Sequence, residues 1–145
     1  MLKVEIMTAD EMRVLLLRLD FGHLGCSRDG HPYVVPMHYV YDGEELYFLT
    51  TEGTKTEFIA ANDEVCFQVE EITDPSKWRS VMLVGSARRI RKPDDLERAM
   101  QLFTARNPTL TPALNRTDVG PWHRQNNLAI YRVKPTAIYG RRTGV

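Results

Sequence analysis

The sequence lacks several features that would narrow its function at once. Lysine and arginine together number 19, and so do aspartate and glutamate, so the chain has no basic excess of the kind that nucleic-acid and acidic-membrane binders carry. No apolar run approaches the roughly 20 residues that a membrane-spanning helix needs. The opening stretch MLKVEIMTADEM has acids where a signal peptide has a basic end and a long apolar run. We therefore expect a cytoplasmic protein that binds neither nucleic acid nor membrane.

Cysteine is also scarce, and the two that occur do not form a recognisable site. Cys26 lies in HLGCS and Cys66 in EVCFQ, both apolar settings, so two reduced, buried thiols are a better interpretation than a disulfide. His23 and Cys26 have an H-x-x-C spacing, but no second pair completes a zinc site. We expect no metal, and a chain of 145 residues is most simply one domain, residues 1–145.

The hydrophobic periodicity predicts a mainly β fold with flanking helices. A T-x-x-E capping box and leucines at helical spacing predict a helix over 8–19; two more are expected from near Thr54 and after Pro93. Alternating patterns predict strands at 22–27, 33–41, 45–51, 64–72 and 80–90, and one or two more within 127–140. The stretch 107–123 is punctuated by prolines and too irregular for a core element. About six strands and three helices indicate a small antiparallel barrel.

The strand expected from Tyr33 to Tyr41 is apolar on both faces. Such a strand should be covered twice, by a barrel interior and by a helix or a partner. Pro36 stands in its middle and cannot donate a hydrogen bond to a neighbouring strand, so we expect an edge, a bulge or an opening there.

A cluster of hydroxyl groups around one lysine follows the next expected strand. Four threonines and Lys55 surround Gly53 where a strand ends and a helix begins; the threonines are Thr50, Thr51, Thr54 and Thr56. Free N–H groups at a helix start, a close-approaching glycine and a lysine together favour a phosphate. The alternative is that Thr54 merely caps the helix, with Glu57 in the reciprocal position.

Three stretches in succession resemble a known family. GHLGCSRDGHPYVVPMHYVYDGEELYFLTTEGTK, NDEVCFQVEE and WRSVMLVGSARRI are similar in order and spacing to the pyridoxamine 5′-phosphate oxidase-like flavin-binding split-barrel family, and most of all to its nitroimidazole-resistance branch. The likeness covers about residues 22–90, with a weaker echo at LAIYRVKPTAIYG. It implies a six-stranded antiparallel Greek-key split barrel that forms a homodimer and holds FMN in a groove at the dimer interface.

The resemblance also implies which residues hold the flavin. The residues along the isoalloxazine ring would be Val34, Pro36, Met37 and His38, with backbone groups near Pro36 and Met37 at its polar edge. The residues around the phosphate would be Thr50, Thr51, Lys55 and Thr56. The residues that match the family's W-R-S-V motif, and would approach the flavin or its ribityl chain, are Trp78, Arg79 and Ser80.

The function implied is a small oxidoreductase that passes electrons from a reduced nicotinamide to a small acceptor such as a nitroaromatic or a quinone. The chain has no Rossmann fingerprint, so a nicotinamide would visit rather than reside. The extra arginines of the enzyme that makes pyridoxal 5′-phosphate have no counterpart, so vitamin B6 oxidation is not expected. The alternatives are a flavin-storing module without catalysis, a relative that uses F420 or haem, and a dimeric scaffold with an empty groove.

Three further residues have two interpretations each. His38 is the candidate catalytic residue, because histidine titrates near neutrality and can donate a proton; it is otherwise a satisfied histidine at the dimer contact. Trp122 is a candidate stacking residue for flavin or substrate, or an interface anchor. His123 belongs to a loop that closes over the site, or is simply solvated.

Overall fold

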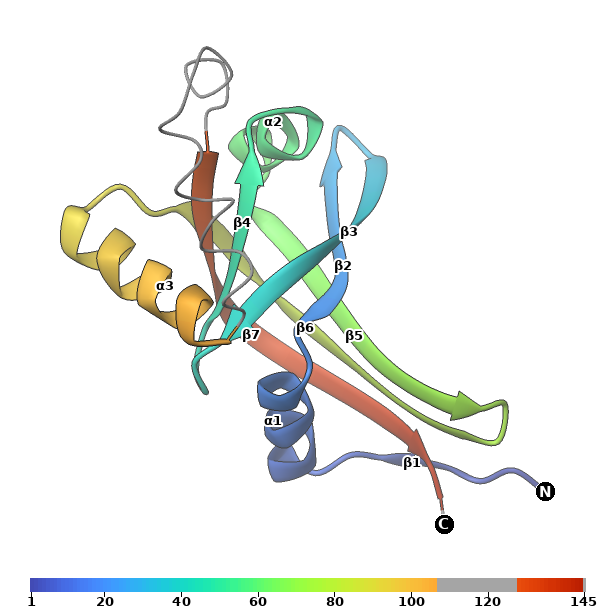
Figure 1. Ribbon diagram of the computed structural model, residues 1–145. Helices are drawn as coiled ribbons and strands as arrows, with labels where there is room; N and C mark the ends of the chain where they lie inside the picture. The colour runs from blue at the N-terminus through green and yellow to red at the C-terminus, as the bar shows by residue number, and fades with distance from the viewer. Residues whose placement is uncertain (107–127, 145) are drawn as a thin grey trace.

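A computed structural model describes residues 1–106 and 128–144 of the protein. The strands are β1 (Val4–Ile6), β2 (Phe21–Arg28), β3 (His31–Tyr41), β4 (Leu46–Thr51), β5 (Glu64–Asp74), β6 (Lys77–Arg89) and β7 (Leu128–Thr143) (Figure 1). The helices are α1 (Ala9–Arg18), α2 (Thr54–Ala61) and α3 (Pro93–Arg106). The segment 107–123, with Trp122 and His123, lies outside the described residues.

The strands form an antiparallel ring, as the sequence predicts. Their order is β1-β7-β4-β3-β2-β5-β6, and a further pairing of β6 with β7 closes six of them into a barrel. β2, β3 and β4 follow one another as hairpins and β5 returns beside β2, which is a Greek key. β1 was not predicted, because three residues are too short for a periodicity; it extends the sheet beyond the ring by pairing with the end of β7.

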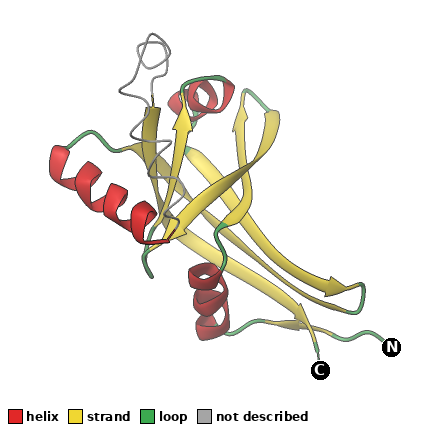
Figure 2. Cartoon of the chain, in the orientation of Figure 1, coloured by secondary structure: helices red, strands yellow, loops and turns green. Residues whose placement is uncertain are grey.

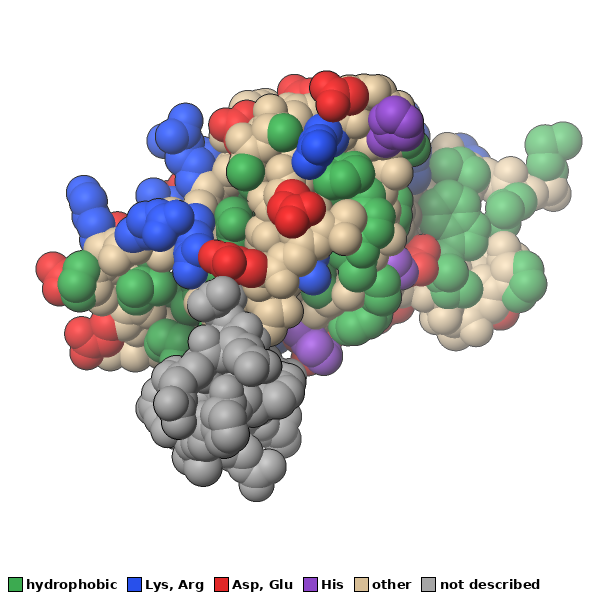
Figure 3. All heavy atoms as spheres, turned by 90° about the horizontal axis from the view of Figure 1, so that it is seen from above, with side chains coloured by type: hydrophobic (Ala, Val, Ile, Leu, Met, Phe, Trp, Pro, Cys, Tyr) green, Lys and Arg blue, Asp and Glu red, His purple; other side chains and the backbone are tan. Residues whose placement is uncertain are grey.

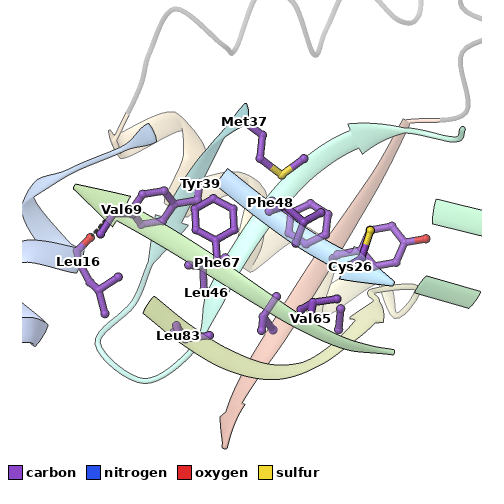
Figure 4. Packing of buried hydrophobic residues seen from close by; sticks show 14 of the residues in the cluster. Leu16, Cys26, Met37, Tyr39, Leu46, Phe48, Val65, Phe67, Val69 and Leu83 are labelled. Atoms are coloured by element: carbon purple, nitrogen blue, oxygen red, sulfur yellow. Dashed lines mark hydrogen bonds between the residues drawn. The ribbon is translucent and has the colours of Figure 1, made fainter. Parts of the chain in front are cut away.

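Most of the hydrophobic core fills the inside of the barrel. Leu24, Phe67, Leu83 and Val133 are completely buried there, each on a different strand. Figure 4 shows Phe67 and Leu83 among the neighbouring core side chains. A second cluster lies outside the barrel, where Ala99 and Phe103 of α3 pack on side chains of β3, β4 and β7. The three helices lie apart from one another around the sheet (Figure 2). α3 thus covers only part of the outer wall.

Helix α1 is anchored to the barrel by a buried hydrogen bond. Thr8 caps it in a reciprocal capping box with Glu11, as predicted. At its other end the hydroxyl of Tyr39, on β3, donates to the Leu16 carbonyl over 2.7 Å (Figure 4). Leu16 belongs to the last turn, where carbonyls have no partner within the helix, so Tyr39 supplies the missing donor. Burial raises the pKa of the Tyr39 phenol.

Three local expectations hold and one needs correction. The β2–β3 hairpin turns at Asp29 and Gly30, with φ of 50° and 79°, as an Asp-Gly pair predicts. The C-terminal region is one long strand, although Pro135 interrupts its ladder where the register shifts beside Gly85. Both cysteines are free thiols, but only Cys26 is buried, because Cys66 points to the opposite, outer face. No helix in the described part of the chain is long and apolar enough to cross a membrane.

Candidate functional site

The barrel is open between β3 and β4. β3 pairs with β2 from His31 to His38, but it pairs with β4 only from Tyr39 to Tyr41. On the N-terminal side of Tyr39 the two strands separate, and a groove of about 280 Å³ opens between them. We call this the β3–β4 groove; it is lined by Pro36, Met37, His38, Leu49, Thr50, Lys55 and Phe103. The opening expected at Pro36 is therefore present.

Some backbone N–H and C=O groups of β3 point into this groove rather than toward β2. The Tyr39 N–H donates to the Asp20 carbonyl at the β2 end of the ladder, over 3.1 Å. Because antiparallel residues alternate between facing one neighbour and facing the other, the polar groups of Val34, Pro36 and His38 face away from β2. Pro36 has no N–H, so its place on this open side leaves no ladder bond unmade. The groove therefore offers backbone donors and acceptors beside an apolar wall.

The phosphate-binding candidates lie at the top of β4. Thr50 is buried at 7% exposure in the wall of the groove, whereas Thr51 is exposed. Helix α2 begins at Thr54 with Gly53 as its N-cap, so the alternative in which Thr54 caps the helix is wrong. The Thr56 hydroxyl accepts from the Gly53 N–H over 2.8 Å and donates to the Gly53 carbonyl over 2.9 Å. Thr56 thereby shapes the turn, and its hydroxyl is already engaged.

Lys55 is the cation of this turn. Its side chain is half-buried in the β3–β4 groove and makes no ion pair with another described residue. The nearby carboxylate of Glu52 is paired instead with Arg89, whose Nη1 lies 2.6 Å from its Oε1. Glu57 is exposed on the first turn of α2. The charge that remains available at the groove is therefore positive.

His38 is held with one ring nitrogen toward the protein. Its Nδ1 lies 3.3 Å from the Asp20 carbonyl, and a carbonyl only accepts, so Nδ1 carries a proton. Phe21 packs edge-on against the ring at a centroid distance of 5.1 Å. Nε2 is thus the nitrogen left for the groove, where it accepts when the imidazole is neutral and donates when it is protonated.

Trp78, Arg79 and Ser80 do not join the other candidates within one chain. They lie on β6 toward the β5–β6 hairpin, which runs away from α2 and α3 (Figure 1). Trp78 and Arg79 line a separate cavity of about 540 Å³ with residues of the hairpin and of the C-terminal end. The Ser80 hydroxyl accepts from the Gln68 amide over 2.9 Å. Within one chain these residues therefore lie away from the β3–β4 groove.

A broad face of the sheet that carries many exposed hydrophobic residues is not covered by any other described part of the chain. The strand register aligns Pro36, His23, Gln68, Met82 and Tyr139 across five strands on the outer side of the barrel. We call this side the open sheet face; its exposed hydrophobic residues are Val4, Ile6, Phe21, Val34, Ile72, Met82 and Tyr139. In the view from above, hydrophobic side chains gather toward one side of the molecule, and others are scattered over the rest of the surface (Figure 3). His38 lies at the rim of this face, beside Phe21.

Sequence reasoning did not find the open sheet face. Its residues come from six strands, and only the register shows that they share a side. The signal that was present is the lack of a polar face on β3, which predicted a second cover. Among the described residues, no three histidine, cysteine or acidic side chains gather as metal ligands.

Comparisons with known proteins agree with this fold. The model of a family described as Pyridoxamine 5′-phosphate oxidase matches residues 8–142. The crystal structure of an FAD-binding protein from Mesorhizobium loti is similar over 100% of both chains, with a TM-score of 0.78 at 23% identity. An FAD-binding protein from Mycobacterium smegmatis has a TM-score of 0.69 at 28% identity, over 95% of this chain and 98% of that one.

Two further relatives complete the comparison. A candidate 5-nitroimidazole antibiotic resistance protein from Bacteroides thetaiotaomicron has a TM-score of 0.75 at 21% identity, over 99% of this chain and 90% of that one. An uncharacterised curated protein from Rhizobium meliloti (strain 1021) is 32% identical over 82 residues, which are 57% of this chain and 54% of the relative. The match thus spans about half of that relative's length. The structural likenesses confirm the split-barrel fold.

Proposed function

The chain belongs to the pyridoxamine 5′-phosphate oxidase family, and on that premise we propose that it is a homodimeric, flavin-binding oxidoreductase. The observation that carries the proposal is the opening between β3 and β4. A flat, phosphorylated ring system needs an apolar wall, hydrogen-bonding groups at its edge and a cation at its tail. The β3–β4 groove has all three within one chain.

FMN is the ligand that we assign to this groove. Val34, Pro36 and His38 would lie along the ring, with the outward-facing backbone groups of β3 at its polar edge. Thr50 and Lys55 would meet the phosphate, together with the free N–H groups at the start of α2. Thr51, which is exposed beside them, would contact the same phosphate. Thr56 acts indirectly, because its hydroxyl fixes the Gly53 turn.

The homodimer supplies what one chain lacks. A groove of about 280 Å³ is at the lower limit for a site that encloses a whole small ligand, so a second wall is needed. The open sheet face is large and apolar, which is typical of a surface that a partner covers. A second copy packed on it would bring Trp78, Arg79 and Ser80 of the partner toward the flavin.

The bound flavin would supply the redox chemistry, taking a hydride from a nicotinamide and passing electrons to a nitroaromatic or quinone-like acceptor. The protein's part is to hold the ring, exclude water and move a proton. His38 is oriented for that last task, because its Nδ1 is fixed on Asp20 and its Nε2 is left for the acceptor. Because the chain has no Rossmann fingerprint, the nicotinamide would bind transiently.

The phosphate assignment is tested by comparing FMN with riboflavin, which has the same ring and no phosphate. A charge-assisted hydrogen bond to a phosphate contributes about 1.5–3 kcal/mol, and half-exposure of Lys55 reduces this to roughly 1–2 kcal/mol. Lys55→Ala should therefore weaken FMN binding about five- to thirtyfold and leave riboflavin affinity nearly unchanged. Lys92→Ala, an exposed lysine outside the groove, is the control. An equal effect on both ligands would remove the assignment.

The redox assignment is tested with the flavin-loaded protein. Anaerobic addition of NADPH should bleach the flavin absorbance, and a nitro compound or a quinone should restore it. A protein that binds FMN but is not bleached would be a flavin store rather than a reductase. A colourless protein that refuses added flavin would be neither, and both parts of the proposal would then be wrong.

A further inference from the structure

A second groove adjoins the β3–β4 groove beneath helix α3. Its volume is about 400 Å³, and Leu49 of β4 lines both grooves. We call it the α3 groove; its floor consists of Ile90, Ala129 and Ile130, which are buried. A volume of this size is within the range of sites that hold small organic ligands. The proposed FMN site uses none of the floor residues.

Helix α3 contributes to the walls of both grooves. Its apolar residues Leu96, Met100 and Phe103 are three or four positions apart, so they lie on one face of the helix. Phe103 is buried and lines the β3–β4 groove, whereas Leu96 and Met100 are partly exposed and line the α3 groove. A molecule that lies beside the proposed flavin in the first groove can therefore extend past Leu49 into the second.

The side chains that line the α3 groove are almost all aliphatic. Apart from Arg89 and Arg91, every one of them belongs to a leucine, an isoleucine, an alanine or a methionine. None of these donates a hydrogen bond, and only the weakly accepting methionine sulfur can receive one. The groove therefore suits a hydrocarbon group, which leaves water for an apolar surface without needing a polar partner.

The charges around the α3 groove balance one another. Arg89 is paired with Glu52, whose Oε1 lies 2.6 Å from the Arg89 Nη1. The segment 91–95, RKPDD, then carries two cations and two acids. The acids, Asp94 and Asp95, are in the first turn of α3, where they also offset the partial positive charge of the helix start. The groove thus has no surplus of positive charge for the phosphates of a nicotinamide donor.

We propose that the α3 groove binds an uncharged aliphatic substituent of the electron acceptor. The preferred acceptor is then a quinone or nitroaromatic ring that bears a hydrocarbon chain, with the ring beside the flavin and the chain along Leu49, Met100 and Ile130. The proposal rests on the flavin site of the proposed function and deepens it by naming the class of substrate. Because the hydrocarbon chain is bound alike before and during the reaction, it should lower KM and leave kcat nearly unchanged.

The test is a series of 1,4-benzoquinones with methyl, butyl, hexyl and octyl substituents, reduced by NADPH with the FMN-loaded protein. A fully buried methylene strengthens binding about fourfold, so in a groove open to solvent we expect kcat/KM to rise about twofold per methylene until the groove is filled. Met100→Gln places an amide in the groove, so it should flatten this rise and leave the methyl compound unchanged. Leu102→Gln is the matched control, an apolar-to-amide change on the same helix outside both grooves, and it should keep the rise.

A binding measurement separates the groove from the flavin chemistry. Calorimetric titration of the flavin-free protein with 1-octanol should show saturable binding, which Met100→Gln weakens severalfold and Leu102→Gln does not. With the FMN-loaded protein, 1-octanol should compete with the octyl quinone and not with the methyl quinone. Octanol that binds without this competition would show that the groove serves a separate aliphatic ligand, and the assignment to the acceptor would then be wrong.

Three further outcomes would overturn the proposal while FMN binding and its dependence on Lys55 stay intact. In the first, kcat/KM does not change with the length of the hydrocarbon chain. In the second, it rises as steeply in Met100→Gln as in wild type, so that the hydrocarbon chain binds elsewhere. In the third, a terminal carboxylate on the octyl chain raises kcat/KM, which would show a cationic groove rather than a balanced one. If wild type binds no flavin, the proposed function fails, and this extension fails with it even if 1-octanol binds.

Discussion

Replacing Tyr39 by phenylalanine should destabilise the protein by about 2 kcal/mol, because it leaves a buried carbonyl without a partner. Tyr39 is 1% exposed and Leu16 is completely buried, and the bond between hydroxyl and carbonyl is 2.7 Å long. The carbonyl has no donor within α1 to fall back on, and removing one oxygen opens no space for water. For a chain of this size the loss corresponds to a fall in Tm of roughly 4–8 °C.

The matched control is Tyr47→Phe. Its hydroxyl donates to Asp42 over 3.2 Å, and the Asp42 carboxylate keeps two backbone N–H donors when this bond is lost. We expect a cost of at most about 1 kcal/mol there. Urea unfolding followed by circular dichroism, with unchanged m-values, measures both variants. A Tyr39→Phe loss below about 0.5 kcal/mol, or no larger than that of the control, would show that the buried carbonyl finds another donor.

Three further predictions concern the dimer, the proton and acid stability. Met82→Glu puts a charge on the open sheet face, so in analytical ultracentrifugation this variant should be a monomer without flavin, whereas Arg88→Glu should keep the proposed dimer. A Met82→Glu variant that still dimerises would show that the open sheet face is not the dimer interface. His38→Gln can keep a bond to Asp20 but cannot transfer a proton, so stopped-flow kinetics should show slower acceptor reduction with unchanged flavin reduction by NADPH; equal slowing would contradict the role. The Thr8 N–H bond holds the pKa of Glu11 below 4.5, so its contribution to stability is present above about pH 4.5 and is lost as the pH falls further. Glu11→Gln should therefore show a shallower loss of stability on acidification, and an unchanged slope would exclude this origin.

Local signals in the sequence predicted the local structure well. The capping box at Thr8 and Glu11 and the turn at Asp29 and Gly30 depend on neighbouring residues alone, so the pattern is sufficient. The cap of α2 was more ambiguous, because Thr54, Thr56 and Gly53 compete over four positions and any of them can satisfy a first-turn group. The structure resolves it through the Thr56 hydroxyl, which bonds both polar groups of Gly53.

The site could be predicted only in part, because much of it depends on contacts between distant strands. Pro36 indicated an opening, but not that β4 would leave β3 after Tyr39. Trp78 matched a motif whose neighbours in one chain are the C-terminal residues, not the groove. The β3–β4 groove brings Pro36 and Phe103 together from distant parts of the chain, and no periodicity in the sequence predicts that contact. Register and helix placement, which arise from packing, are what the sequence pattern leaves open.

The proline at the opening also has a consequence for how the protein stays dispersed when its groove is vacant. A strand edge with unpaired backbone groups can form hydrogen bonds with a strand of another molecule, and such pairing is a route to aggregation in sheet proteins. Pro36 has no backbone N–H, so a strand that paired with β3 here would lack one hydrogen bond in the middle of its ladder. Pro36 thus hinders a peptide from pairing with β3 at the groove, which leaves the groove available to the flavin that we propose for it.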